Sequence, residues 1–199
     1  MDDIQEHPEI VDIIMNRNLV GLNPNQMLLH GPTKRLLHNY HWHSPNIGIV
    51  GSYSPTTRDV EDHFGLFRGV DQIEAFAQAS IVSCATFLEC RKLQCTPAAL
   101  KEKFIPAFIS IGQVYFHNYV ELGDTFISLA QIKFFKWRQM VCDGRIYKVP
   151  KGVNLNEYFS GFNEERLLKY DISKDFTLVT ELFDITGRAI KIELLKKTE

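Results

Sequence analysis

The sequence lacks the features that mark several large classes of protein. Lys and Arg number 22 against 24 Asp and Glu, for a net charge of −2, and basic residues are scattered, so no nucleic-acid partner is expected. No stretch approaches the roughly 18–20 uninterrupted apolar residues of a membrane span, and residues 1–30 hold no apolar core of the signal-peptide kind. The four cysteines lack zinc-site spacing, which favours reduced thiols in a cytoplasmic protein.

What remains is 199 residues, 45% of them hydrophobic, which is enough for one globular domain with a substantial core. The pattern predicts a short helix over 3–15, strands over 35–43 and 46–54, and a long helix over 70–92 that is apolar on nearly all faces. Strands over 107–120, 124–141 and 144–150 follow, then an irregular or partly helical segment. Residues 176–195 predict a hairpin around "DITGR". This order predicts an α+β protein in which a curved antiparallel sheet wraps around one long buried helix.

The stretch "HFGLFRGVDQIEAFAQA" at residues 63–79 resembles the signature of the β-hydroxyacyl-acyl carrier protein dehydratases, the FabZ/FabA group of the hotdog fold. His63, Phe64 and Gly65 match the first half of that signature. The second half is matched by Gly69, Val70, Glu74, Ala75, Ala77 and Gln78. Three residues of the family's loop are missing, including both prolines. The resemblance covers roughly two-thirds of the chain, because residues 1–25 match poorly and residues 139–175 look like an insertion.

Asp71, Glu74 and Gln78 stand at i, i+3 and i+7 and therefore share one face of the predicted helix. On a helix that is otherwise apolar, this stripe is expected to be buried or to open onto a cavity. A carboxyl group buried there without partners would have a raised pKa, and a neutral acid can protonate a leaving hydroxyl. The resemblance implies this role for Glu74, with Gln78 orienting it. Asp71 departs from the family's apolar residue and either raises a neighbouring pKa or faces solvent. The inert alternative is a stripe that faces a partner subunit or buried water.

The resemblance implies that His63 is the base that takes the α-proton of a thioester. If the gap in the loop is placed elsewhere, Val60 occupies that position and the base is lost. A histidine in the charged stretch "RDVEDH" is also an ordinary surface residue. His63 is therefore the feature that separates dehydration from hydrolysis or binding.

Gly69 and Val70 begin the predicted helix, where free backbone N–H groups and the helix dipole favour an oxyanion. The resemblance implies that such an N–H polarises the thioester carbonyl. Gly69 is alternatively a loop residue with a positive φ. Arg68, which replaces a proline of the family, has three candidate partners: Glu61 or Asp62, an acid of a carrier protein, or a phosphopantetheine phosphate.

Three histidines in "HNYHWH" invite a metal interpretation. On a regular strand His41 and His43 would share one face and His38 the other, with no carboxylate nearby to complete a set. Interfacial or exposed histidines are the favoured interpretation, and no metal site is expected.

The resemblance implies a dehydratase that converts a 3-hydroxyacyl thioester into the trans-2-enoyl thioester in a fatty-acid-like, polyketide or specialised lipid pathway. The substrate would be carried on the phosphopantetheine of an acyl carrier protein or on coenzyme A, without a metal or redox cofactor. A homodimer with the histidine of one subunit beside the glutamate of the other is expected. The alternatives are a hotdog thioesterase and a non-catalytic hotdog subunit that binds acyl chains or carrier protein.

Overall fold

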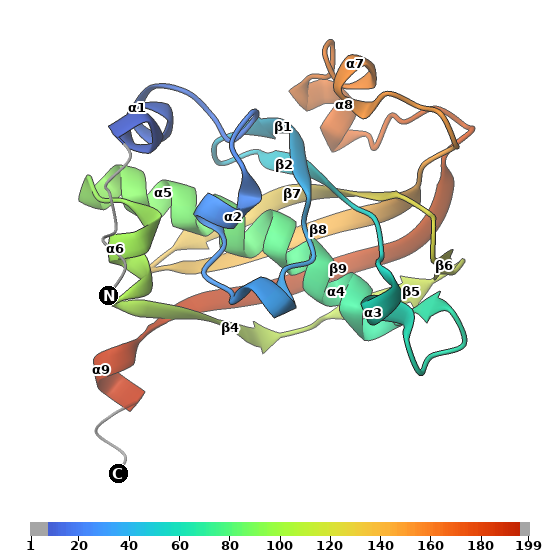
Figure 1. The fold of residues 1–199 in the computed structure, drawn as a ribbon. Coiled ribbons are helices and arrows are strands. Elements are labelled where there is room, and N and C mark those ends of the chain that lie inside the picture. Colours follow the sequence, from blue (N-terminus) through green and yellow to red (C-terminus); the bar gives the residue numbers. More distant parts are fainter. Residues whose placement is uncertain (1–7, 196–199) are drawn as a thin grey trace.

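A computed structural model describes residues 8–195 and shows a curved antiparallel sheet wrapped around one long helix (Figure 1). In these residues the main sheet has seven strands in the order β1-β2-β7-β8-β9-β4, with β5 also paired to β9. A second, two-stranded sheet pairs β3 with β6. The strands are β1 (Asn39–Ser44), β2 (Gly48–Tyr53), β3 (Leu66–Phe67), β4 (Phe104–Ser110), β5 (Gln113–Phe116), β6 (Val120–Glu121), β7 (Phe126–Lys136), β8 (Gln139–Lys148) and β9 (Thr177–Lys191).

The long helix forms as three consecutive segments: α4 (Gly69–Ala77), the π-helical turn η2 (Gln78–Val82) and α5 (Ser83–Leu93). It packs on the inner face of the sheet so closely that a Cβ on Gly144 of β8 would clash with the Phe76 ring. Its length and hydropathy would suit a membrane span, yet 83% of its most apolar window is buried inside the chain. The sequence pattern of a helix apolar all round is therefore that of a core helix.

Short helices pack beside the long helix and the sheet. The helices α1 (Pro8–Asn16) and α2 (Pro24–Met27) both contact α5, and α6 (Pro97–Lys101) follows it. Of the helix expected over residues 3–15, residues 3–7 lie outside the described part. The remaining short elements are η1 (Pro32–Lys34), α3 (Thr57–Val60) and α9 (Ile192–Leu195).

The outer face of the sheet carries a layer of its own. Residues 139–148, the first part of the segment that was expected to be an insertion, form β8 between β7 and β9. The rest of that segment leaves the sheet and contains α7 (Leu155–Tyr158) and α8 (Glu164–Leu168), drawn in orange in Figure 1. Their side chains bury the outward-facing residues of β2, β7 and β8 in a second apolar cluster, which contains Val50, Ile127, Leu129, Tyr147, Phe159, Phe162, Leu167 and Phe176.

The strands differ from the sequence prediction in three places. Residues 176–195 do not form a hairpin, because β9 runs without reversal and absorbs "DITGR" as an irregularity in which Asp184 has a φ of +55°. Residues 124–141 hold a reversal instead: β7 and β8 turn at Trp137 and Arg138, both with positive φ. The expected strand 107–120 is divided into β4 and β5, both paired to β9.

Candidate active site around Glu74

The carboxyl group of Glu74 is held from two sides. Gln78 Nε2 donates a hydrogen bond to Glu74 Oε1 at 2.8 Å, and His30 Nε2 lies 3.4 Å from the same oxygen. The Glu74 side chain is 34% exposed and has polar partners, so it opens onto a cavity, the second of the two expected placements, instead of lying buried. The shared helix face is real, since Asp71 and Glu74 both line one cleft.

Gln78 is fully buried and fixes this arrangement to the chain segment that precedes β1. Its Nε2 also donates to the backbone oxygen of Lys34 at 2.7 Å, and its Oε1 accepts from the backbone N–H of Leu36 at 2.7 Å. With both amide atoms engaged, the side chain can adopt a single orientation. The carboxyl oxygen of Glu74 is thereby positioned by the core of the protein.

His30 was not anticipated from the sequence. It lies in the loop after α2, far from Glu74 along the chain, and its side chain is 21% exposed. Burial lowers the pKa of His30 below its usual range, while the Glu74 carboxylate opposes that shift and Arg35 and Lys101 add to it. Its Nδ1 is buried without a hydrogen-bond partner in the described residues.

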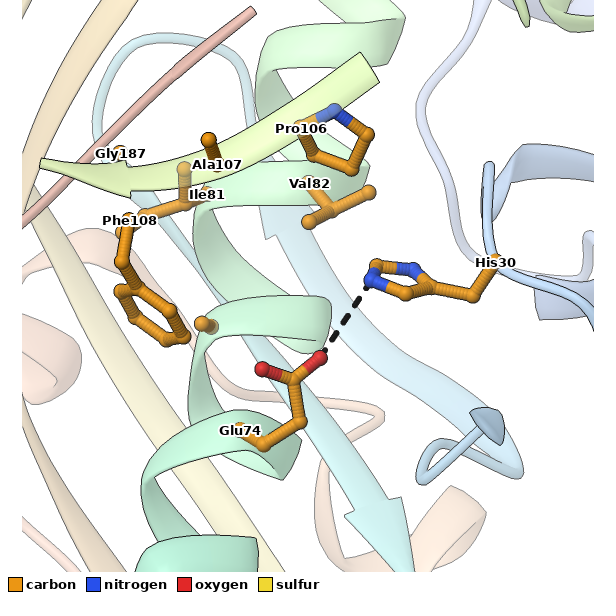
Figure 2. Close-up of a pocket in the computed structure, with 9 residues that line it drawn as sticks. His30, Glu74, Ile81, Val82, Pro106, Ala107, Phe108 and Gly187 are labelled. Atoms are coloured by element: carbon orange, nitrogen blue, oxygen red, sulfur yellow. Dashed lines mark ion pairs between the residues drawn. The ribbon is translucent and has the colours of Figure 1, made fainter. Parts of the chain in front are cut away.

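Glu74 and His30 lie where two cavities meet. One is a polar cleft of about 690 Å³, lined also by Lys34, Asp59 and His63. The other is a small apolar pocket of about 40 Å³ between the central helix and the sheet edge. Figure 2 shows the two side chains pointing toward each other across the mouth of this pocket. Its remaining walls come from Ala77, Ile81, Val82, Pro106, Ala107, Phe108 and Gly187.

His63 lines the same cleft as Glu74 within a single chain. Its Nδ1 lies 3.1 Å from the backbone oxygen of Leu66, a contact that fixes the ring when Nδ1 carries the proton. The loop around it is tightly turned, with positive φ at Asp62, Phe64 and Gly65. No hydrogen bond or ion pair joins His63 to Glu74 in the part of the chain that the structure describes.

Arg68 and Asp71 pair with each other at the start of α4. Arg68 Nε and Nη2 donate to the two carboxylate oxygens of Asp71 at 2.6 and 2.9 Å. The expectation that Arg68 pairs with Glu61 or Asp62 is therefore wrong, because the acid one helical turn ahead offers two-pronged geometry. The positive charge of Arg68 thus balances the negative charge of Asp71.

Gly69 and Val70 occupy the first turn of α4, where their N–H groups have no acceptor within the helix. Gly69 is not among the residues with positive φ. A Cβ there would lie 2.8 Å from the ring of Phe116, so a larger residue would require that exposed ring to move. Neither Gly69 nor Val70 is among the residues that line the two cavities, whereas Arg68 and Asp71 line the cleft.

The histidines of β1 serve the packing of both faces. A β-bulge between Tyr40 and Trp42 reverses the alternation, so His41 and His43 do not share a face as the sequence suggested. His41 bonds Asn156 and Ser52, whereas His43 accepts from Leu19 N and packs on Phe87. Residues 8–195 contain no cluster of metal-ligating side chains, and all four cysteines are free thiols.

Comparison with known proteins identifies the architecture. No protein-family model and no curated protein matches the sequence. The dehydratase heterocomplex ApeI:P from Xenorhabdus doucetiae aligns with 89% of this chain and 97% of its own, at a TM-score of 0.60 and 12% identity. The chain has the hotdog fold. AziG from S. sahachiroi (TM-score 0.46, 12% identity, 78% of this chain and 92% of its own) is also similar.

A thioesterase family protein from Silicibacter pomeroyi is similar too, at a TM-score of 0.46 and 12% identity, with 77% of this chain and 84% of its own aligned. At 12% identity the alignment with ApeI:P establishes the fold alone, and the chemistry has to be argued from the side chains of this chain.

Proposed function

We propose that this hotdog protein is a dehydratase that removes water from a 3-hydroxyacyl thioester to give the trans-2-enoyl thioester. The observation that carries the proposal is the Glu74 carboxyl group, oriented by a fully buried glutamine at the point where a polar cleft meets an apolar pocket. The apolar pocket of about 40 Å³ suits the first carbons of a short acyl group, and the polar thioester and its carrier suit the larger cleft. The dehydratase heterocomplex with the same fold supports this choice of reaction.

In the proposed reaction Glu74 protonates the β-hydroxyl as it leaves, and a histidine of the same cleft takes the α-proton. Such acid–base assistance contributes roughly 10²–10⁴-fold to a rate. The first-turn N–H groups of α4, at Gly69 and Val70, are the proposed donors to the thioester carbonyl. The reaction requires no metal or redox cofactor, since an acidic α-proton and a protonated leaving group suffice.

The proposal includes a carrier and a second copy of the chain. The acyl group would arrive on the phosphopantetheine of an acyl carrier protein or on coenzyme A, in a fatty-acid-like, polyketide or specialised lipid pathway of the cytoplasm.

The edge of the sheet at β4 and β5 carries exposed apolar side chains, a surface suited to pairing with another strand edge. These are Ile105, Phe108, Ile109, Ile111, Tyr115 and Phe116, from 38% to 51% exposed. Light scattering on the purified protein tests the dimer.

The reaction is tested in the hydration direction. Crotonyl thioesters of coenzyme A and of an acyl carrier protein are incubated with the protein and with Glu74→Gln, and products are followed by mass spectrometry. Glu61→Gln, which changes another carboxylate of the cleft, is the control. We expect the gain of one water with the thioester intact, lost in Glu74→Gln and retained in Glu61→Gln.

Other products would contradict the dehydratase. Release of free acid that depends on Glu74 would identify a thioesterase, in which the carboxylate activates water that enters the open cleft. Binding of the acyl carrier without turnover would identify a non-catalytic hotdog subunit.

A further inference from the structure

We propose that His30, rather than His63, is the base that takes the α-proton, so that one chain supplies both the acid and the base. This inference rests on the proposed dehydratase function and names a residue of its site. Neither the signature around His63 nor any pattern in the loop after α2 pointed to His30. It is found only because the fold brings that loop over the first half of the central helix.

The position of His30 suits a reaction at two adjacent carbons. Its Nε2 lies 3.4 Å from Glu74 Oε1, and both side chains reach the mouth of the same apolar pocket (Figure 2). Syn elimination requires acid and base on one side of the Cα–Cβ bond, which a pair this close provides. Distances between catalytic groups are often long without substrate and shorten when it binds.

The surroundings of His30 keep its imidazole in the state that a base requires. Burial lowers the pKa of His30, and the charges of Arg35 and Lys101 act in the same direction. The opposing influence is the carboxylate of Glu74, which disappears when Glu74 carries the proton that it must donate. Burial and the neighbouring cations therefore favour the neutral imidazole of His30, the form that accepts a proton.

The proton balance closes within the pair. The Cα–H bond breaks as its proton moves to His30 Nε2, and the electron pair is held in a thioester enolate until it forms the Cα–Cβ double bond. The Cβ–O bond breaks as the Glu74 proton moves to that oxygen, releasing water. His30 is then an imidazolium beside the Glu74 carboxylate, a stabilising ion pair. Transfer of the proton from Nε2 to Oε1 restores the starting state.

His63 is placed less well for this step. It is anchored to Leu66 on a loop whose neighbouring Phe64 is 96% exposed. Within residues 8–195 it makes no hydrogen bond or ion pair with Glu74, whereas His30 Nε2 lies within ion-pair distance of that carboxylate. Its position along the cleft suits contact with the carrier portion of the substrate.

Exchange of the α-proton separates the base from the acid. A 3-hydroxybutyryl thioester in D₂O is incubated with Glu74→Gln, which retains a base but no acid, and with double variants that add His30→Gln or His63→Gln. We expect deuterium at Cα with Glu74→Gln, its loss when His30→Gln is added and its retention with His63→Gln. In the otherwise wild-type chain, His30→Gln should lower kcat/KM for dehydration by about 100-fold or more. Loss of exchange with His63→Gln and retention with His30→Gln would overturn the proposal.

A second measurement does not depend on turnover or on the folding of a histidine variant. The ring nitrogens of His30 are titrated by ¹⁵N NMR in the wild-type chain and in Glu74→Gln. We expect a lower His30 pKa in Glu74→Gln, because the carboxylate that supports the imidazolium is gone. An unchanged titration would refute the pair even if the protein dehydrates thioesters. A shifted titration without any thioester turnover would instead refute the proposed function.

Discussion

The two halves of the central helix differ in what surrounds them. Over α5 the helix is covered by α1, α2 and α6 in addition to the sheet, and Cys84, Phe87 and Cys90 are completely buried. Over α4 one face is left open to the cleft, and it carries Asp71 and Glu74. The same continuous helix is therefore part of the core over α5, the closed half, and forms the wall of a site over α4, the open half.

The change occurs at the π-helical turn Gln78–Val82. Turns of this type inside α-helices occur frequently at functional sites, because the extra residue rotates the following side chains. Gln78, the first residue of this turn, directs its side-chain amide toward Glu74. Ser83 Oγ donates a hydrogen bond to the backbone carbonyl of Gln78 at 2.6 Å. The difference teaches that covering segments and one local irregularity, rather than helix composition, decide where this helix carries polar chemistry.

Deleting a large side chain from the closed half should show the largest loss of stability. We expect Phe87→Ala to lower the free energy of unfolding by about 3–5 kcal/mol, because a completely buried ring leaves a cavity. Denaturant unfolding measures the change, with Phe134→Ala, whose ring is 42% exposed, as the matched control. Catalysis at low temperature should change little. A large loss of kcat/KM in folded Phe87→Ala would break the distinction between the halves.

Lowering the pH should reduce the free energy of unfolding through His43, which packs on Phe87 of the closed half. Burial lowers the pKa of His43 from 6.5 to about 3, so the unfolded chain binds a proton in this interval that the folded chain does not. Its contribution is complete above pH 6.5 and is lost as pH falls toward 3, at about 1.4 kcal/mol per pH unit. We expect His43→Asn, which retains an acceptor for Leu19 N, to flatten the decline of unfolding free energy with pH. An equally steep decline would contradict this assignment.

Much of this comparison was accessible from the sequence, because it depends on helical periodicity. The length of the helix, its burial, and the common face of Asp71, Glu74 and Gln78 follow from the spacing of residues 69–93. The hotdog architecture was predicted correctly from the alternation of strand and helix patterns together with the family signature.

The remainder depends on contacts between distant segments and on local irregularities. "DITGR" has the composition of a turn, yet β9 continues through it because Asp184 N donates to Asp143 Oδ1 and the strand keeps its neighbours. One bulge at His41 was enough to exchange the faces of two histidines. His30 meets Glu74 only through the path of the loop after α2, for which no periodicity exists.

Gln78 has two functions at the open half: it accepts a hydrogen bond from the Leu36 N–H, and it positions Glu74. Replacing it should separate the two. We expect Gln78→Leu to lower unfolding free energy by about 1–3 kcal/mol, since the buried Leu36 N–H loses its acceptor. It should also lower kcat more than it changes KM, because Glu74 loses a positioning partner. Gln72→Leu is the control: Gln72 is equally buried on α4 but bonds to Phe67 and Thr180. Equal losses of kcat in both variants would show that stability alone matters.

The smallest effect is expected at the π-helical turn, where the two halves of the helix meet. Tyr40 OH donates to Ser83 Oγ at 2.7 Å, and Ser83 in turn donates to the Gln78 carbonyl, so β1 is tied to the π-helical turn. We expect Tyr40→Phe to lower unfolding free energy by about 1 kcal/mol, the usual value of one hydrogen bond. Because Ser83 keeps its bond to Gln78, kcat/KM should remain at the wild-type value. If kcat/KM falls as well, β1 holds the turn in place, and the open half depends on the sheet as well as on its own helix.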